Sequence, residues 1–188
     1  RDNYIKKYAD PDNTIEFSSA FGGYKFLTDG TNNEALTLTK QGQAVFPQDM
    51  TVNNITVGNG SSSSVSNTAL GNDTFNNPTG FSNTAIGMSA LKSVTTGEQN
   101  TAVGRRALEV NTEGVDSVGI GYSALGNATG NQNVGIGRSS GSELTTGSNN
   151  TLIGFNAQPS APDVSNEVTI GNDDVTYTRL KGNVVCKD

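Results

Sequence analysis

The sequence predicts an all-β protein that is largely a β-solenoid, in which short strands stack coil upon coil. A five-residue phrase recurs seven times between Asn67 and Gly171, at steps of 16 or 17 residues. A second glycine, such as Gly80 or Gly97, follows about half a period away in most coils. Two recurring glycines per repeat indicate that each coil has two straight runs and two corners. The composition, 32% hydrophobic and 6% aromatic with no Trp, fits a thin repetitive core better than a thick globular one.

Residues 1–58 are expected to form a charged connector and a small all-β module. Apolar runs there alternate with turn signals such as Gly22-Gly23 and Asp29-Gly30, and Lys40–Gln43 is typical of a hairpin loop. The module has little apolar mass for independent stability. Its expected strands are residues 14–17, 24–27, 35–39, 44–46 and 51–57.

The solenoid segment is expected to span residues 59–171, and a tail follows over 172–188. Serine-rich residues 58–66 suggest a flexible joint, although Ile55–Gly58 also resembles the repeated phrase and could start an incomplete first coil. Pro159 and Pro162 interrupt the rhythm before one last copy of the phrase. In the tail, Val175–Leu180 and Val184-Val185 have strand-like composition.

Side chains alternate within each phrase, as they must on a strand. One face is branched and apolar, and we expect it to form a single stacked row inside the coils. The other face is small, and we expect it to lie against a neighbouring chain or a second strand layer, because such a row buries little alone. The expected inner row is Ile86, Val103, Ile120, Ile136 and Ile153, and the small-residue row is Ala85, Ala102, Gly119 and Gly135.

The second run of each coil, such as Ser89–Leu91 or Arg106–Leu108, supplies one more apolar residue to the core. These runs are too short for a stable helix, so a strand or tight turn is favoured. The phrase-opening asparagines, for example Asn83 and Asn100, are either stacked so that their amides bond coil to coil, or placed at corners with positive φ. The pattern alone leaves both interpretations open.

Charge and composition exclude several classes of function. The net charge is −6, and no basic cluster is larger than Lys6-Lys7 or Arg105-Arg106, so nucleic acid is not an expected partner. No run is long enough for a membrane span, and no secretion leader opens the sequence. The sequence lacks His, which removes the usual triads and zinc sites, and its single Cys186 cannot form an internal disulfide.

Carboxylates remain as candidates for glycan cleavage. Most fall at corners, where acidic residues keep a repetitive surface soluble, and no motif pairs them. Asn172–Asp174 could hold a hard cation, but it matches no calcium-binding loop and is better interpreted as a solvated turn. We therefore expect no catalytic residue, metal or cofactor. The carboxylates considered are Asp73, Glu98, Glu109, Glu113, Asp116, Glu143, Asp173 and Asp174.

The residue after each phrase-ending glycine varies in size and charge while its neighbours repeat, so it is expected to lie outside the core. Four of these residues are types that stack on sugars or bind carboxylates, and we expect them to contact a ligand: Arg105, Tyr122, Arg138 and Phe155. The alternative is that they only cover the outer wall, with Phe155 packed under the Pro159 loop. The full set is Asn72, Met88, Arg105, Tyr122, Arg138, Phe155 and Asn172.

The repeats, such as Asn83–Gly87 followed by Ala90-Leu91 and Thr95–Gly97, resemble the collar and head repeats of trimeric autotransporter adhesins. They resemble still more the repeats in tail fibres and tail spikes of tailed bacteriophages, and residues 34–58 are similar to the segment that precedes such repeats. The period of 16–17 is longer than in adhesin heads, and no stalk or anchor is recognised, which favours the phage branch.

This resemblance implies a homotrimer of β-rolls or interwoven triple β-helices. It implies a non-enzymatic fibre segment in a virion tail fibre, which contacts other tail proteins and attaches to a glycan or receptor on the host surface. The alternatives are a fibre-borne polysaccharide depolymerase and a trimeric adhesin on a bacterial cell surface.

Many phage fibres of this kind end in an intramolecular chaperone that releases itself after trimerisation. The resemblance leads to the hypothesis that Asp188 is the terminus left by such a cleavage. Three copies of Cys186 near a threefold axis could not all pair, so reduced thiols are expected there. The alternative is that the sequence ends at an arbitrary boundary.

Overall fold

The structure is a computed structural model that describes residues 24–28, 33–38, 44–45, 50–52, 55–59, 66–75, 78–179 and 181. The described residues form strands and turns, and no helix is present among them. The chain divides into two compact units, residues 1–48 and 49–188. The expected strand at Thr14–Phe17 lies outside the described residues.

The first unit contains a three-stranded antiparallel sheet in the order β1-β2-β3. Its strands are β1 (Tyr24–Thr28), β2 (Asn33–Leu38) and β3 (Ala44–Val45). A register shift interrupts the β1–β2 pairing between Phe26 and Leu27. Antiparallel pairing of β2 with β3 agrees with the hairpin expected around Lys40–Gln43.

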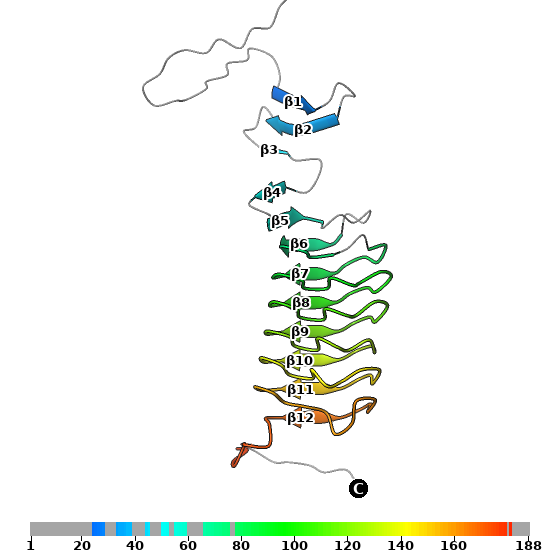
Figure 1. Ribbon diagram of the computed structural model, residues 1–188, viewed down its shortest axis with the longest axis vertical. Helices are drawn as coiled ribbons and strands as arrows, with labels where there is room; N and C mark the ends of the chain where they lie inside the picture. The colour runs from blue at the N-terminus through cyan, green and yellow to red at the C-terminus, as the bar shows by residue number, and fades with distance from the viewer. Residues whose placement is uncertain are drawn as a thin grey trace, which may run out of the picture. The chain divides into compact units, whose positions relative to one another are not determined.

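The second unit is a β-solenoid, as the repeats predict, and it carries one nine-stranded sheet. Figure 1 shows β6–β12 stacked one above another, with a loop connecting each strand to the next. These seven strands pair in parallel, each residue opposite its counterpart in the next copy of the phrase. They are β6 (Thr68–Gly71), β7 (Thr84–Ile86), β8 (Thr101–Val103), β9 (Val118–Ile120), β10 (Val134–Ile136), β11 (Thr151–Ile153) and β12 (Val168–Ile170).

Two antiparallel strands extend the sheet ahead of the coils: β4 (Met50–Val52) and β5 (Ile55–Gly58). Residues 55–58, expected in the N-terminal module, thus pair with β6 in the solenoid sheet. Because that pairing is antiparallel, Ile55–Gly58 is not an incomplete first coil of the same kind. At the other end, Val175–Arg179 form no strand, contrary to expectation, and Val184-Val185 lie outside the described residues.

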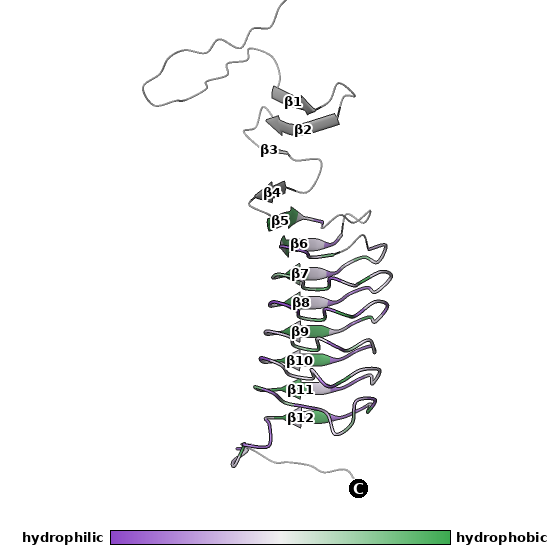
Figure 2. Cartoon of the chain, in the orientation of Figure 1, coloured by the Kyte–Doolittle hydropathy of each residue, from purple (hydrophilic) through white to green (hydrophobic). Residues whose placement is uncertain are grey.

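The two faces of the strands lie opposite to the sequence-based expectation. The branched residues do form one stacked row, since Ile86, Val103 and Ile120 are register partners in successive strands. That row faces outward: Ile86, Ile120, Ile136 and Ile153 are 37–38% exposed. The expected internal position of Ile86, Val103, Ile120, Ile136 and Ile153 is therefore wrong. Figure 2 shows hydrophobic colour along β9, β10 and β12, and polar colour along many of the loops.

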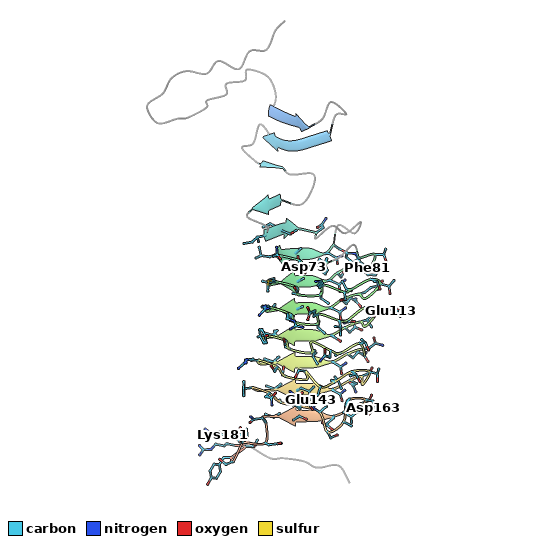
Figure 3. All side chains as sticks on the ribbon, viewed as in Figure 1. Asp73, Phe81, Glu113, Glu143, Asp163 and Lys181 are labelled. Carbon is cyan, nitrogen blue, oxygen red and sulfur yellow. The ribbon has the colours of Figure 1, made fainter. Side chains whose placement is uncertain are left out.

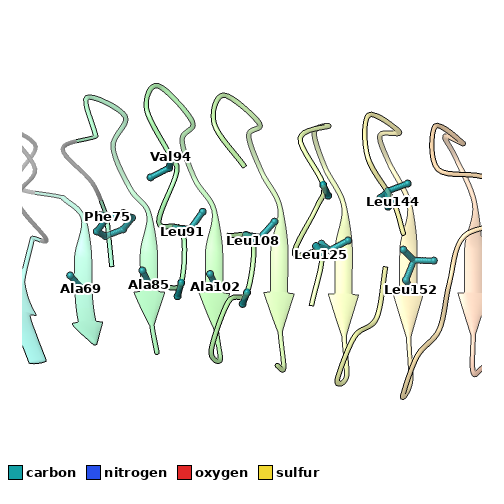
Figure 4. Packing of buried hydrophobic residues seen from close by; sticks show 13 residues of the cluster. Ala69, Phe75, Ala85, Leu91, Val94, Ala102, Leu108, Leu125, Leu144 and Leu152 are labelled. Atoms are coloured by element: carbon teal, nitrogen blue, oxygen red, sulfur yellow. The ribbon is translucent and has the colours of Figure 1, made fainter. Parts of the chain in front are cut away.

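The small residues face the inside of the coils. Ala85, Ala102 and turn side chains such as Leu91, Leu108 and Leu125 are fully buried and belong to one cluster, which Figure 4 shows between strand and turn layers. A Cβ on Gly119 would lie 3.1 Å from Leu108 Cγ, and one on Gly135 would lie 2.6 Å from Leu125 Cγ. The small-residue row, Ala85, Ala102, Gly119 and Gly135, is thus buried as expected, but against the turns of its own chain rather than a neighbouring chain.

The turn leucines explain why that row must be small. Leu91, Leu108 and Leu125 are fully buried in turns, which confirms the expected contribution of the second run. All three have φ of 48–51°, a conformation that bulky residues seldom adopt. We infer that burial of each side chain, which contributes about 1.5–3 kcal/mol, offsets this backbone strain.

One coil exchanges the large and small positions. Gly141 occupies the turn site held by Leu in the three preceding coils, and Leu152 occupies the strand site held by Ala or Gly in the five preceding strands. A Cβ on Gly141 would lie 2.6 Å from Leu152 Cδ1, so the two sites share one fixed interior volume. The interior of a coil therefore accepts one large side chain at this contact, from either the turn or the strand.

The phrase-opening asparagines form a buried hydrogen-bond ladder, so the stacked interpretation is confirmed. Asn83 N donates to Asn67 Oδ1 at 2.8 Å, and Asn100 N donates to Asn83 Oδ1 at 3.0 Å. Each amide also reaches across its own coil, as where Asn83 Nδ2 donates to Gly97 O at 2.8 Å. The positive φ angles fall instead on the preceding residues, among them Ser82 and Gln99.

Glu167 ends this ladder and fixes the proline-containing loop. Its backbone N donates to Asn150 Oδ1 at 2.9 Å. Its Oε1 accepts from Ser160 N at 2.9 Å and from Thr169 Oγ1 at 3.0 Å, and its Oε2 accepts from Ser160 Oγ. The Ser160 hydrogen bonds lower the pKa of Glu167 below its usual value.

The first prediction tests the shared interior volume. Leu152→Gly should leave a cavity and lower the free energy of unfolding by about 3–5 kcal/mol. Gly141→Leu should overpack the same space at a cost of about 1–3 kcal/mol. The double variant moves the large side chain from strand to turn, as in the preceding coils, and should recover at least about 1 kcal/mol relative to the sum of the singles. Urea denaturation followed by circular dichroism measures the three values, and simple additivity would contradict the shared volume.

The second prediction concerns acid stability. Because folding lowers the pKa of Glu167, its stabilising effect is present above the unfolded-state pKa and is lost as the pH falls through the folded-state pKa. Glu167→Gln should therefore lower the melting temperature at pH 7 and leave it nearly unchanged at pH 2. Thermal denaturation of both proteins across this range measures the difference. A gap between the two proteins that stayed constant with pH would contradict the role of the ionised carboxylate.

Candidate functional site

The residues that follow the phrase-ending glycines form a column at one corner of the coils, here called the variable column. Main-chain hydrogen bonds fix its rungs: Arg106 N donates to Met88 O at 2.9 Å, Ser123 N to Arg105 O at 2.9 Å and Ser139 N to Tyr122 O at 2.8 Å. A Cβ on Gly87 would lie 2.7 Å from the carbonyl carbon of Gly104, so only glycine lets the coils approach this closely just before the column. Side chains of the column therefore project from a rigid support.

The expected ligand-binding residues Arg105, Tyr122, Arg138 and Phe155 occupy four consecutive rungs, and all four are exposed. Arg105 Cζ lies 5.6 Å from the centre of the Tyr122 ring, and Arg138 Cζ lies 5.8 Å from the same ring. Arg138 Cζ is also 5.5 Å from the centre of the Phe155 ring. The structure thus joins the four side chains into one ladder of alternating guanidinium and aromatic groups.

Phe155 is 59% exposed, which argues against the alternative that it packs under the Pro159 loop. Tyr122 is 39% exposed. Met88 on the rung before Arg105 is exposed as well, whereas Asn172 on the last rung is partly buried. The column therefore presents aromatic surface to solvent instead of closing over the coils.

Two arginines of the column differ from the other cations of the coils. Lys92 forms an ion pair with Asp73 at 2.7 Å, and Arg106 Nε donates to Glu109 Oε2 at 2.5 Å. The Glu109 carboxylate, and to a smaller extent the Tyr122 hydroxyl, raise the pKa of Arg106. Within the described part of the chain, Arg105 and Arg138 make cation–π contacts but no hydrogen bond or ion pair through their guanidinium groups. Their N–H donors are free to bind a ligand.

The outward strand face is a second candidate surface, which the sequence-based assignment placed inside. Its apolar line, here called the outer row, runs through register partners in consecutive strands. Thr, Val or Ile flanks each rung on the same face, so the face carries no charge. The signal that could have revealed its orientation is the exchange of Gly141 and Leu152, which shows that the small row faces the turn leucines. The outer row is Val57, Leu70, Ile86, Val103, Ile120, Ile136, Ile153 and Ile170.

The carboxylates do not assemble into a site. Asp73 and Glu109 are each paired with a cation, and Figure 3 shows Glu113 and Asp163 on loops of different coils. Asn172 Nδ2 donates to Asp174 Oδ2 at 3.2 Å within an exposed turn. Within the described ranges, no group of three or more His, Cys, Asp or Glu side chains could hold a metal ion. Cys186 and Lys6-Lys7 lie outside the described residues.

Comparison with known proteins gives no match to a family model, a curated protein or a solved structure. No helix among the residues that the structure describes is long and apolar enough to cross a membrane.

The third prediction tests whether the variable column lies outside the core. Tyr122→Leu and Arg105→Gln remove cation–π contacts at an exposed site, so each should change the free energy of unfolding by no more than about 1 kcal/mol. Leu108→Ala, at a fully buried position, should lower the free energy of unfolding by about 2–5 kcal/mol. Urea denaturation of the three variants under the same conditions makes the comparison. A loss at Tyr122 as large as at Leu108 would contradict a surface position.

Proposed function

We propose that this chain is a non-enzymatic segment of a homotrimeric fibre, the tail fibre or tail spike of a bacteriophage, which attaches the virion to a glycan or protein on the host cell surface. The repeats that resemble such fibres coincide with the coils of the solenoid, residues 67–171. The dispersed carboxylates give no support to a cleavage reaction. New reducing ends after incubation with capsular polysaccharide or lipopolysaccharide would instead identify a depolymerase.

The observation that carries the proposal is the exposed outer row. It extends over eight consecutive strands, so at about 4.8 Å per strand it is roughly 34 Å long. A continuous apolar line of this length on an uncharged face is typical of an interaction surface in a soluble protein. A second and third copy of the chain carry the same line and can cover it along its whole length, because the coils of each copy have the same rise.

This arrangement revises the interface expected from the sequence. Trimerisation through Ala85, Ala102, Gly119 and Gly135 is excluded, since the chain itself buries those positions. In the proposed fibre, the three outward sheet faces meet at a common axis and bury the outer rows. The copy number of three comes from the resemblance to trimeric fibres, and association through this face comes from its exposure and lack of charge.

The fourth prediction tests the proposed assembly. Ile120→Lys places a charge in the middle of the outer row, where association would bury it without a partner, so the protein should become monomeric. The coil should remain folded, because Ile120 contributes little to the interior of its own chain. Sedimentation velocity and circular dichroism measure the two effects. Thr112→Lys, an equal charge change at an exposed loop residue, is the matched control and should stay trimeric.

A wild-type protein that sediments as a stable folded monomer would overturn the fibre proposal. A dimer would retain association through the outer row and overturn the threefold arrangement. Loss of the trimer in both lysine variants would show that added charge, and not its position, controls assembly.

A further inference from the structure

The variable column combines two chemistries in a fixed order along the solenoid. Arg105 and Arg138 lie two rungs apart, and Tyr122 and Phe155 occupy the intervening and following rungs. With a rise of about 4.8 Å per coil, the two guanidinium groups repeat at roughly 9.6 Å along the stack. The main-chain hydrogen bonds between rungs hold this spacing before any ligand binds. Such preorganisation lowers the entropic cost of binding.

The electrostatics of the column are opposite to those of the whole chain. The net charge is −6, yet the nearby carboxylate of Glu109 is engaged by Arg106 and that of Asp73 by Lys92. Arg105 and Arg138 thus retain unshared positive charge and planar donor groups that suit carboxylate or sulfate. An anion on this column would meet two exposed cations whose positions are set by contacts with aromatic rings.

The aromatic residues of the column indicate which kind of chain links the anionic groups of the ligand. Tyr122 and Phe155 expose ring surface beside the arginines, and an exposed ring offers a flat apolar face to the C–H bonds of a sugar. A linear column of rungs, without an enclosing wall, suits an extended chain that lies along the coils. A nucleic acid would also stack and carry charge, but a chain of net charge −6 with only two arginines in this column is poorly suited to a polyphosphate.

We propose that Arg105, Tyr122, Arg138 and Phe155 form a binding site for an acidic polysaccharide laid parallel to the solenoid axis. Its carboxylate or sulfate groups are held by Arg105 and Arg138, and its sugar faces stack on Tyr122 and Phe155. This inference rests on the proposed function, because it specifies the class of surface glycan that the fibre segment recognises.

The fifth prediction uses the full chain in its native assembly and a purified oligogalacturonate as the probe, measured by isothermal titration calorimetry. Arg105→Gln/Arg138→Gln should weaken binding at least about tenfold, since both charge-assisted contacts are lost. The matched control, Arg179→Gln/Lys181→Gln, makes the same change in net charge at exposed positions beyond the coils and should bind within about twofold of wild type. Tyr122→Leu/Phe155→Leu keeps both arginines and should weaken binding about fivefold through lost stacking.

Three further probes separate the possible sources of affinity. The methyl-esterified oligogalacturonate has the same sugars without charge and should not bind measurably. A sulfated dextran oligosaccharide tests whether sulfate replaces carboxylate, and binding that depends on the two arginines supports the proposal for either anion. Single-stranded DNA of similar length should bind more weakly than the acidic sugar, and tighter DNA binding would overturn the choice of ligand.

The remaining outcomes distinguish this inference from the proposed function. Equal losses in the two double-charge variants, or unchanged binding of the esterified sugar, would overturn the site. Failure of every anionic sugar to bind, while the labelled trimer still coats cells in a panel of bacterial strains, would overturn the site and leave the attachment function standing. Failure to bind both sugars and cells would overturn both. If Arg105→Gln/Arg138→Gln abolished the trimer in sedimentation, the column would be a subunit contact and the inference would be wrong.

Discussion

The close stacking of one coil on the next through the main chain governs the rest of this structure. Strand residues pair in parallel register, and hydrogen bonds such as Arg106 N to Met88 O repeat that stacking at the corners. At this separation a Cβ cannot be accommodated where glycines meet, as the 2.7 Å between a Cβ on Gly87 and the Gly104 carbonyl carbon shows. The glycine period is therefore a steric requirement of the stack and the origin of its regular rise.

Close stacking also determines how the interior is filled. A coil of 16 or 17 residues encloses little space, so one large side chain must serve each contact between strand and turn. Leu108 fills that space opposite Gly119, whereas Leu152 fills it opposite Gly141. The polar side of the coil is closed by the asparagine ladder, in which each amide satisfies a neighbour in the next coil and a carbonyl across its own. A buried amide that lacked these partners would cost about 1–3 kcal/mol, so the ladder also fixes the register.

The same constraint gives the surface its character. Since turn leucines and small strand residues complete the interior, the branched residues of the strands remain outside as an uncharged row. Since the corners are locked, the variable residues project at a constant rise, and substitutions there need not disturb the coils. The proposed fibre assembly uses the uncharged outer row, and the proposed acidic-glycan site uses the variable column at the corners. Stability and recognition are thereby assigned to different sides of one repeating unit.

Much of the architecture follows from the sequence because it depends on local periodicity. The solenoid, the span of its regular coils and the turn at Met88–Ser93 can be derived from the spacing of glycines and the brevity of the runs. The exposed position of the variable residues follows from their variation among constant neighbours. The antiparallel pairing of β5 does not follow, because Ile55–Gly58 has the composition of the phrase, and composition does not set the direction in which a strand pairs with β6.

The tertiary structure decided which side of each strand is the inside. The alternation of side chains along a strand places Ile120 and Gly119 on opposite faces, but it does not show which face lies inside the coil. A row of branched apolar residues can line the interior or form an outer interaction surface. The choice depends on Leu108, eleven residues away, whose volume leaves room for Gly119 and none for a second large side chain. It also decided that Arg105 and Arg138 have no carboxylate partner among the described residues, because Glu109 pairs with Arg106 and Asp73 pairs with Lys92. The sequence by itself determined the repeating unit, and side-chain volume across the coil determined what that unit buries and what it presents.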